Sequence, residues 1–192
     1  MSTSKERPEQ KGRPQQRIEF EALEKYQYVS RKEVAAQLEK FGLGESRQMV
    51  DALYVSKDRL TAVGVLEIDE EMCRDHLINS PIFQGVLGPE AMAQTWILWK
   101  MHTGELKDNQ TARFAGLDKI RFRHSLYPGA TVNIALKKAG EDKVYGQILL
   151  GKEVITEGEL QAVVIEKEQA EYNAIRRKRI QANSAPLFPI KE

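Results

Sequence analysis

Cysteine is nearly absent from this chain, since Cys73 is the only one among 192 residues. A single thiol excludes an intrachain disulfide and any metal site built from several cysteines. No apolar stretch reaches the roughly 18 residues that a membrane-spanning helix needs. The first residues also lack the apolar stretch of a secretory signal. These absences predict a cytoplasmic protein without a membrane span, in which Cys73 is a small half-buried hydrophobe.

An excess of charge of either sign is also missing. Lys and Arg number 29 against 28 Asp and Glu, which leaves a formal net charge of +1. A globally basic surface for nucleic acid is therefore excluded, and only local basic patches are left to consider. The hydrophobic share of 41% is typical of a globular chain, and 192 residues suffice for one domain with a substantial core.

Composition divides the chain into three parts. Residues 1–27 are polar, and the first of them are rich in Pro and Gln, which favours a disordered N-terminal extension. Residues 28–166 carry the apolar periodicity and form the predicted domain. Residues 167–192 begin as a charged segment that permits a helix and end in an irregular tail.

The first helix signal within the predicted domain lies at Ser30. Ser30 is a favourable N-cap, and Glu33 completes a capping box three residues later. The helix that begins there covers about Arg31–Phe41, and Gly42 ends it.

A second helix is predicted over residues 86–103. Pro89 suits its first turn, and Gly104 ends it. The stretch Ala91–Trp99 is apolar on nearly all sides, so the helix must be surrounded by other elements.

The remaining apolar segments have strand lengths and are separated by turn residues. They cover residues 48–56, 60–68, 112–122, 131–137, 143–150 and 153–165. Strands that follow one another across tight turns pair antiparallel. The order of elements therefore predicts an α+β fold in which one antiparallel sheet wraps around the long central apolar helix.

A histidine and a carboxylate flank the loop that enters this helix. The imidazole of His76 exchanges protons near neutral pH. Glu90 stands in the first helical turn, where interaction with the helix dipole is an alternative explanation for it. The N–H groups of the stretch Gly85–Gly88 have no partner within the helix and could polarise a carbonyl oxygen. An acid, a base and an oxyanion site beside an apolar helix suit proton transfer next to a thioester carbonyl.

The segment from His76 to Gln94 resembles the active-site motif of the (3R)-hydroxyacyl-acyl-carrier-protein dehydratases of the FabZ type, a family with the hot-dog fold. Its pattern is His-Phe-Pro-Gly-x-Pro-x-x-Pro-Gly-Val-Leu-x-x-Glu-Ala-x-Ala-Gln. The positions in register are His76, Pro81, Gly85, Val86, Leu87, Glu90, Ala91, Ala93 and Gln94. Residues 118–123 and 127–129 also resemble the family's third strand and its Pro-Gly turn. The resemblance covers about residues 28–166.

The resemblance implies dehydration of a (3R)-hydroxyacyl thioester, carried on acyl carrier protein, to the trans-2-enoyl thioester, with no cofactor and no metal. Such a reaction belongs to fatty-acid or polyketide-like synthesis. His76 would take the C2 proton, and Glu90 would help to protonate the departing hydroxyl. Gly85, Val86 and Gln94 would contact the substrate, with orientation of the Glu90 carboxyl as a second role for Gln94. A homodimer or trimer of dimers is also implied, with His and Glu from different subunits.

The chain departs from the family in the loop that presents His76. Leu77-Ile78-Asn79 replaces Phe-Pro-Gly, which removes a fixed φ and a position free to adopt positive φ. Asn79 is the residue expected to tolerate left-handed geometry. Gln84 replaces a further Pro. This altered loop keeps two alternatives open, namely a hot-dog acyl thioesterase and a non-catalytic hot-dog subunit that binds acyl chains or a partner.

Four other residues have simpler explanations than catalysis. His102 is expected at a helix C-terminus, where the helix dipole favours a cation. His124 ends a basic strand segment that an acidic carrier protein could contact, although a solvated strand face explains it as well. Trp96 and Trp99 are expected to pack in the core or at a dimer interface.

Overall fold

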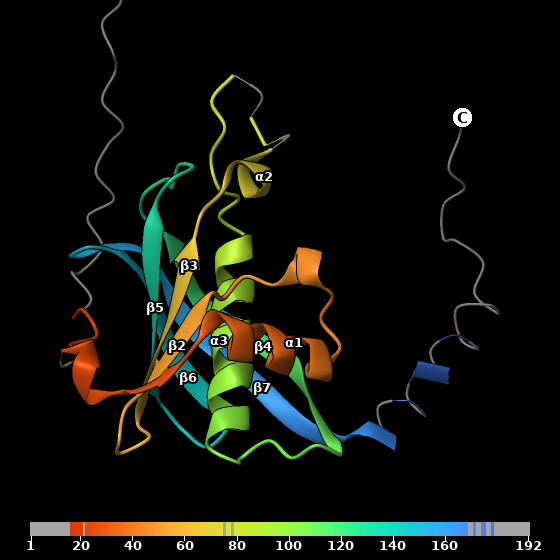
Figure 1. Cartoon of the computed structure of the whole chain (residues 1–192). Helices are drawn as coiled ribbons and strands as arrows, with labels where there is room; N and C mark the ends of the chain where they lie inside the picture. Colours follow the sequence, from red (N-terminus) through yellow and green to blue (C-terminus); the bar gives the residue numbers. More distant parts are fainter. Residues whose placement is uncertain are drawn as a thin grey trace, which may run out of the picture.

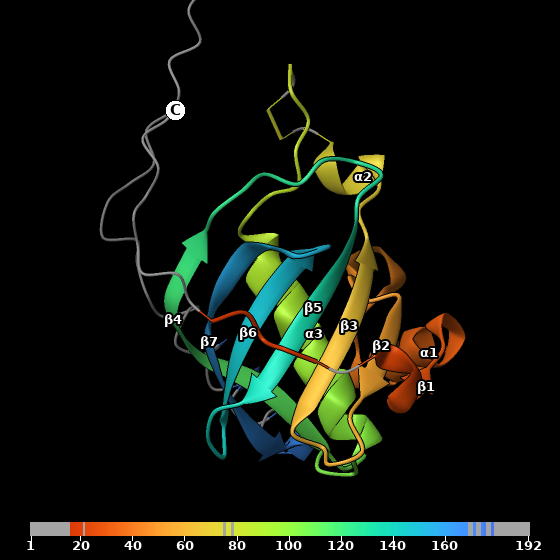
Figure 2. The same cartoon turned by 90° about the vertical axis from the view of Figure 1, so that its left-hand side faces the viewer.

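One antiparallel sheet dominates the computed structural model, which describes residues 16–20, 22–74, 76–77, 79–168, 171, 174–175 and 178. Among these residues, seven strands pair in the order β1-β2-β3-β5-β6-β7-β4. They are β1 (Gln27–Val29), β2 (Ala52–Val55), β3 (Thr61–Glu67), β4 (Gln110–Phe122), β5 (Thr131–Lys138), β6 (Lys143–Leu150) and β7 (Glu153–Glu166). The sheet curves around α3 (Leu87–His102), as Figures 1 and 2 show. The predicted α+β hot-dog architecture is confirmed.

The helix α1 (Arg31–Phe41) has the predicted bounds and the predicted caps. The Ser30 hydroxyl accepts a hydrogen bond from the Glu33 N–H at 3.4 Å, and the Ser30 N–H donates to the Glu33 carboxylate at 2.9 Å. Gly42 ends the helix with a φ of 105°, in the left-handed region that favours glycine.

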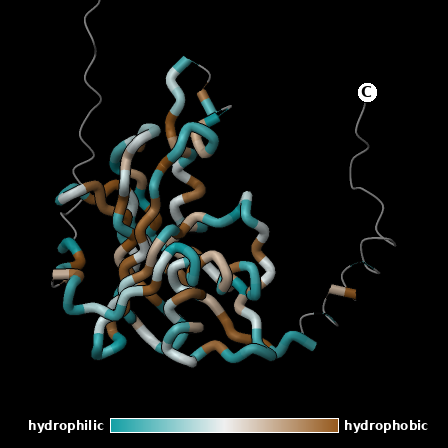
Figure 3. The backbone as a smooth tube through the Cα atoms, viewed as in Figure 1, coloured by the Kyte–Doolittle hydropathy of each residue, from teal (hydrophilic) through white to brown (hydrophobic). Residues whose placement is uncertain are grey.

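The helix α3 is buried along most of its length. Every residue of Ala91–Trp99 is buried, including the two tryptophans, so their predicted place in the core is confirmed. Figure 3 shows hydrophobic segments gathered in the middle of the molecule and hydrophilic ones at its turns. The burial of this helix accounts for the position of the sheet, which must cover it on several sides.

Two glycines of the sheet let α3 approach closely. A Cβ on Gly64 in β3 would lie 2.5 Å from Thr95 Oγ1, and a Cβ on Gly146 in β6 would lie 2.9 Å from Met92 Sδ. Both distances are shorter than real Cβ contacts allow, so a larger residue at either position requires the α3 side chain or the backbone beside it to shift.

The segment Gln16–Phe20 crosses the outer face of the sheet, on the side away from α3 (Figure 2). Ile18 is 4% exposed and packs with Ala135 of β5 and Leu149 of β6. Within the extension 1–27, these five residues therefore lie against the sheet, with Ile18 as their buried contact. Residues 1–15 and most of 169–192 lie outside the described part of the chain.

Three short features differ from the sequence prediction. The strand predicted over 48–56 begins only at Ala52, because the Met49 N–H donates to a side chain of α3 instead of to a strand. The strand β1 and the helix α2 (Glu70–Cys73) were not predicted, since elements of three and four residues are too short to show a periodic pattern of apolar residues. Cys73 is fully buried, more deeply than expected, and burial raises the pKa of its thiol.

No helix within the described residues is both long enough and apolar enough to cross a membrane.

The close contact between Gly64 and Thr95 yields a stability test. We expect Gly64→Ala to lower the free energy of unfolding by about 1–3 kcal/mol, since the added methyl overpacks the contact with α3. Urea unfolding measures this change. Gly44→Ala is the matched control, because a Cβ there meets no atom within 4 Å. In the double variant Gly64→Ala/Thr95→Ala the two losses should be less than additive; full additivity would contradict the contact.

Candidate active site

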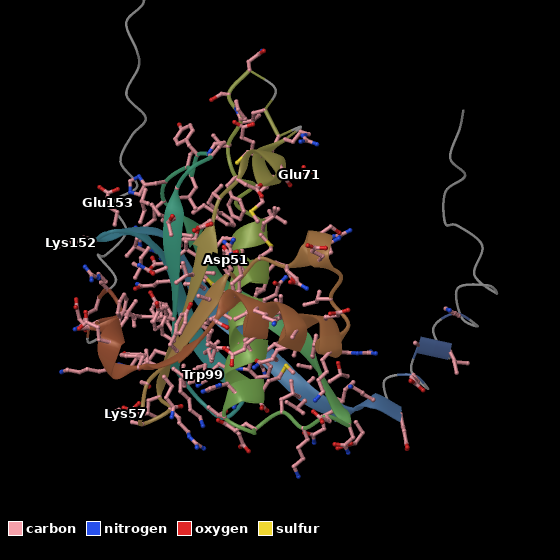
Figure 4. All side chains as sticks on the ribbon, in the orientation of Figure 1. Asp51, Lys57, Glu71, Trp99, Lys152 and Glu153 are labelled. Atoms are coloured by element: carbon pink, nitrogen blue, oxygen red, sulfur yellow. The ribbon has the colours of Figure 1, made fainter. Side chains whose placement is uncertain are left out.

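The loop between α2 and α3 lies at one end of the molecule. Figure 1 shows it rising from the end of α2 and returning to the start of α3. In Figure 4, Glu71 of α2 marks this end, and Lys57, in the turn between β2 and β3, marks the opposite one. The loop therefore brings its polar residues to the N-terminal end of the apolar helix.

A hydrogen bond fixes the imidazole of His76. Its Nδ1 lies 3.0 Å from the carbonyl oxygen of Ile82, and the ring is partly buried. A carbonyl oxygen can only accept, so Nδ1 carries the hydrogen, and in the neutral ring Nε2 therefore keeps its lone pair. This tautomer is the one that can act as a general base through Nε2.

The residue after His76 adopts a strained backbone conformation. Leu77 has a φ of 57°, and its side chain is 58% exposed. A left-handed leucine costs about 1–3 kcal/mol, and the surrounding loop must supply that energy. The altered loop therefore turns directly after the histidine.

Glu90 accepts a hydrogen bond from Gln94. The Gln94 Nε2 donates to Glu90 Oε1 at 2.9 Å and to the Arg47 carbonyl at 2.8 Å, while its Oε1 accepts from the Met49 N–H at 2.8 Å. The side chain is fully buried, so all its bonding capacity serves the protein. Of the two roles expected for Gln94, this geometry supports orientation of Glu90 and leaves no group exposed to a substrate.

The start of α3 presents two N–H groups without acceptors. Within the described residues, neither the Gly85 nor the Val86 N–H donates a hydrogen bond, whereas the next two amides bond to Gln84 and Gly85. Val86 is 70% exposed, and a Cβ on Gly85 would lie 3.1 Å from the ring of Phe122. The amides are thus available to a carbonyl oxygen in the way that an oxyanion hole requires.

A cavity of about 180 Å³ adjoins Gly85. Three elements line it: the loop before α3, the end of β4 with the residues that follow, and β7. The lining residues are Ile82, Phe83, Gly85, Phe122, His124, Ser125, Leu126, Ile155 and Thr156. The place of His124 and Ser125 in this wall was missed, because nothing in the sequence pairs the end of a strand with a loop 40 residues earlier.

The predicted acid and base have different hydrogen-bond partners in this structure. Among the described residues, His76 bonds to Ile82 and Glu90 bonds to Gln94, and no hydrogen bond joins the two. The same residues contain no group of three or more His, Cys, Asp or Glu side chains that could hold a metal ion. His76 and Glu90 of one chain therefore have separate hydrogen-bond partners.

Comparison with known proteins places the predicted site residues within a family match. The FabA-like domain family matches residues 48–164, which contain every predicted site residue. The 3-hydroxyacyl-[acyl-carrier-protein] dehydratase FabZ of Variovorax paradoxus is 34% identical over 108 residues, which cover 53% of this chain and 72% of the relative.

Solved structures agree on the fold. A chain of the dehydratase heterocomplex ApeI:P from Xenorhabdus doucetiae has a TM-score of 0.60 at 14% identity, over 71% of this chain and 96% of that one. A hot-dog-like protein from Thermanaerovibrio acidaminovorans has a TM-score of 0.51 at 11% identity, over 61% and 89%. Together with the match over residues 48–164, these likenesses lead to one assignment. The chain belongs to the FabA-like family, as a relative of the FabZ-type dehydratases.

Proposed function

We propose that this chain dehydrates a (3R)-hydroxyacyl thioester, carried on acyl carrier protein, to the trans-2-enoyl thioester. The observation that carries the proposal is the hydrogen bond from His76 Nδ1 to the Ile82 carbonyl, because it leaves Nε2 as a base. Acyl carrier protein enters as the carrier through the name of the Variovorax relative. The proposed domain is residues 28–166, and the proposed location is the cytoplasm.

The proposed reaction uses the two residues in sequence. His76 Nε2 removes the C2 proton, and the electron pair moves toward the thioester oxygen, which the Gly85 and Val86 amides stabilise. The pair then forms the C2–C3 double bond as the C3–O bond breaks. Glu90 gives its proton to the departing hydroxyl, which leaves as water. His76 then loses its proton to solvent, and Glu90 takes up a proton from solvent, which restores both residues.

The proposed active site needs two copies of the chain if Glu90 of one copy is to face His76 of the other. The strand β4 lies at the sheet edge, and among the described residues it pairs only with β7. It carries exposed apolar side chains, with Phe114 at 44%, Leu117 at 53% and Phe122 at 49% exposure. A long apolar edge is open to pairing with another strand. We infer a dimer through β4 as the working unit, with a trimer of dimers as its larger form.

The reaction can be tested with 3-hydroxybutyryl and longer 3-hydroxyacyl thioesters on acyl carrier protein. We expect enoyl absorbance to rise without release of free thiol. His76→Ala and Glu90→Gln should each lower kcat/KM by about 10²- to 10⁴-fold, as for loss of a general base or acid.

Other outcomes would identify the alternatives. Free thiol without enoyl product would indicate a thioesterase, and folded protein with neither product would indicate a non-catalytic subunit. His102→Ala is the control, since that imidazole lies at the other end of α3 and hydrogen-bonds Gln27. Full activity in His76→Ala would refute the mechanism.

The contact between Gln94 and Glu90 gives a second prediction. Gln94→Leu should lower kcat/KM by about tenfold or more, because the Glu90 carboxyl loses the hydrogen bond from Gln94 Nε2 that orients it. It should also cost about 1–3 kcal/mol of stability, since the Met49 N–H is left buried and unpaired. Thr95→Val is the matched control on the same helix, because its hydroxyl bonds only to the Ala91 carbonyl. Equal activity in the two variants would argue against a role for Gln94.

The proposed dimer gives a third prediction. Leu117→Arg should convert the dimer to monomer in analytical ultracentrifugation and abolish most dehydratase activity, because a charge on the paired edge is not compensated. Leu60→Arg is the control, since Leu60 is 52% exposed in the turn before β3, away from β4. An active monomeric Leu117→Arg variant would exclude a shared site.

A further inference from the structure

A charged cluster lies buried on the outer face of the sheet, away from α3. Glu157 of β7 has a side chain that is only 1% exposed. Its carboxylate accepts from Arg123 Nε at 3.0 Å and from the Tyr145 hydroxyl at 2.7 Å, and the Arg123 guanidinium forms a second bond to it. A carboxylate in this position is tolerated only while it is paired and hydrogen-bonded. The cluster, defined as Arg123, Tyr145, Gln147 and Glu157, is therefore sensitive to the loss of any member.

The N-terminal segment Gln16–Phe20, here named the strap, closes this cluster. The Ile18 N–H donates to Gln147 Oε1 at 2.7 Å, and Gln147 Nε2 donates to the Tyr145 hydroxyl at 3.0 Å. Gln147 is fully buried, and the Ile18 side chain packs on Leu149 beside it. One side-chain amide thus joins the backbone of the strap to the bonding network of Glu157.

The other end of the cluster reaches the loop of His76. Arg123 directly follows β4, and its N–H donates to the Ile155 carbonyl at 2.8 Å. Three residues later, the Leu126 carbonyl accepts from the Phe83 N–H at 2.9 Å. Phe83 follows Ile82, whose carbonyl fixes the His76 ring. Phe83 and Leu126 are each 4% exposed, so this connection is packed as well as hydrogen-bonded.

We propose that Gln147 and Glu157 are positioning residues for His76 and that the strap locks them in place. The strap hydrogen-bonds to Gln147, and Glu157 of the cluster binds Arg123. The segment after Arg123 bonds through Leu126 to Phe83, which follows the Ile82 carbonyl that orients the imidazole. The proposal rests on the proposed function for its effect on catalysis. Its structural part concerns only the orientation of His76 and can be tested without a substrate.

Two substitutions break the connection at separate points. Gln147→Leu keeps the side-chain volume and removes the bonds to Ile18 and Tyr145, whereas Ile18→Ala removes the apolar anchor of the strap. Val34→Ala is the control, because Val34 is buried on α1 in the main core, in contact with neither strap nor cluster. All three are expected to lose stability, so stability alone does not decide the matter.

Hydrogen exchange and ¹⁵N NMR of the full-length chain provide the deciding measurements. In the native protein His76 should show one fixed tautomer with the hydrogen on Nδ1. In Gln147→Leu and Ile18→Ala, we expect that signal to shift toward the average of two tautomers. The Arg123 and Phe83 amides should exchange about tenfold faster than in Val34→Ala. The kcat/KM should fall by about tenfold, a size that small misplacement of a base explains.

The outcomes separate this proposal from the proposed function. Unchanged His76 tautomer and unchanged exchange at Arg123 and Phe83, relative to Val34→Ala, would overturn the positioning role. The positioning role would also be overturned if the His76 tautomer and the amide exchange both changed while kcat/KM stayed within twofold of the native value. If the native protein forms no enoyl product, the proposed function fails, and the NMR result still decides whether the strap orients His76. Where Gln147→Leu does not fold, Ile18→Ala gives the same test.

Discussion

The structure depends above all on the burial of α3, a helix that is apolar on nearly every side. Such a helix cannot rest on a flat sheet, because one face of a sheet covers only one side of it. The sheet instead curves around it, and Gly64 and Gly146 reduce the separation until the backbone of the sheet nearly touches helix side chains. The position of Glu90 follows from this packing, since the carboxyl sits in the first turn of a helix that is held on several sides.

The fold was predictable because its determinants are local. Ser30 and Gly42 mark the ends of α1, and the apolar run Ala91–Trp99 shows that a helix needs covering. The order of strands in the sheet was not predictable in this way. The pairing of β3 with β5 and of β4 with β7 depends on contacts between distant segments, for which a single sequence carries no periodic signal. The strap was missed for a related reason, since one buried isoleucine does not alter the polar composition around it.

The candidate site was predictable where one continuous segment supplies its residues. His76, Gly85, Val86, Glu90 and Gln94 all lie between one loop and the first turns of one helix, so spacing and chemistry could identify them. Their bonding partners lie elsewhere in the chain. The carbonyl that fixes His76, the backbone groups at Arg47 and Met49 that hold Gln94, and the wall with His124 are set by the tertiary structure. The left-handed turn at Leu77 also follows from the whole loop and not from residue preference.

The pairing of β4 with β7 has a consequence for synthesis of the chain. The strand β4 is complete at Phe122, but its partner β7 begins at Glu153 and ends at Glu166, after β5 and β6 have been made. A ribosome adds roughly 5–20 residues per second, so β4 waits on the order of seconds with both edges unpaired. During that time it can associate with another nascent chain as readily as with its own. Association between copies through the edge that β7 later occupies would therefore compete with completion of the sheet.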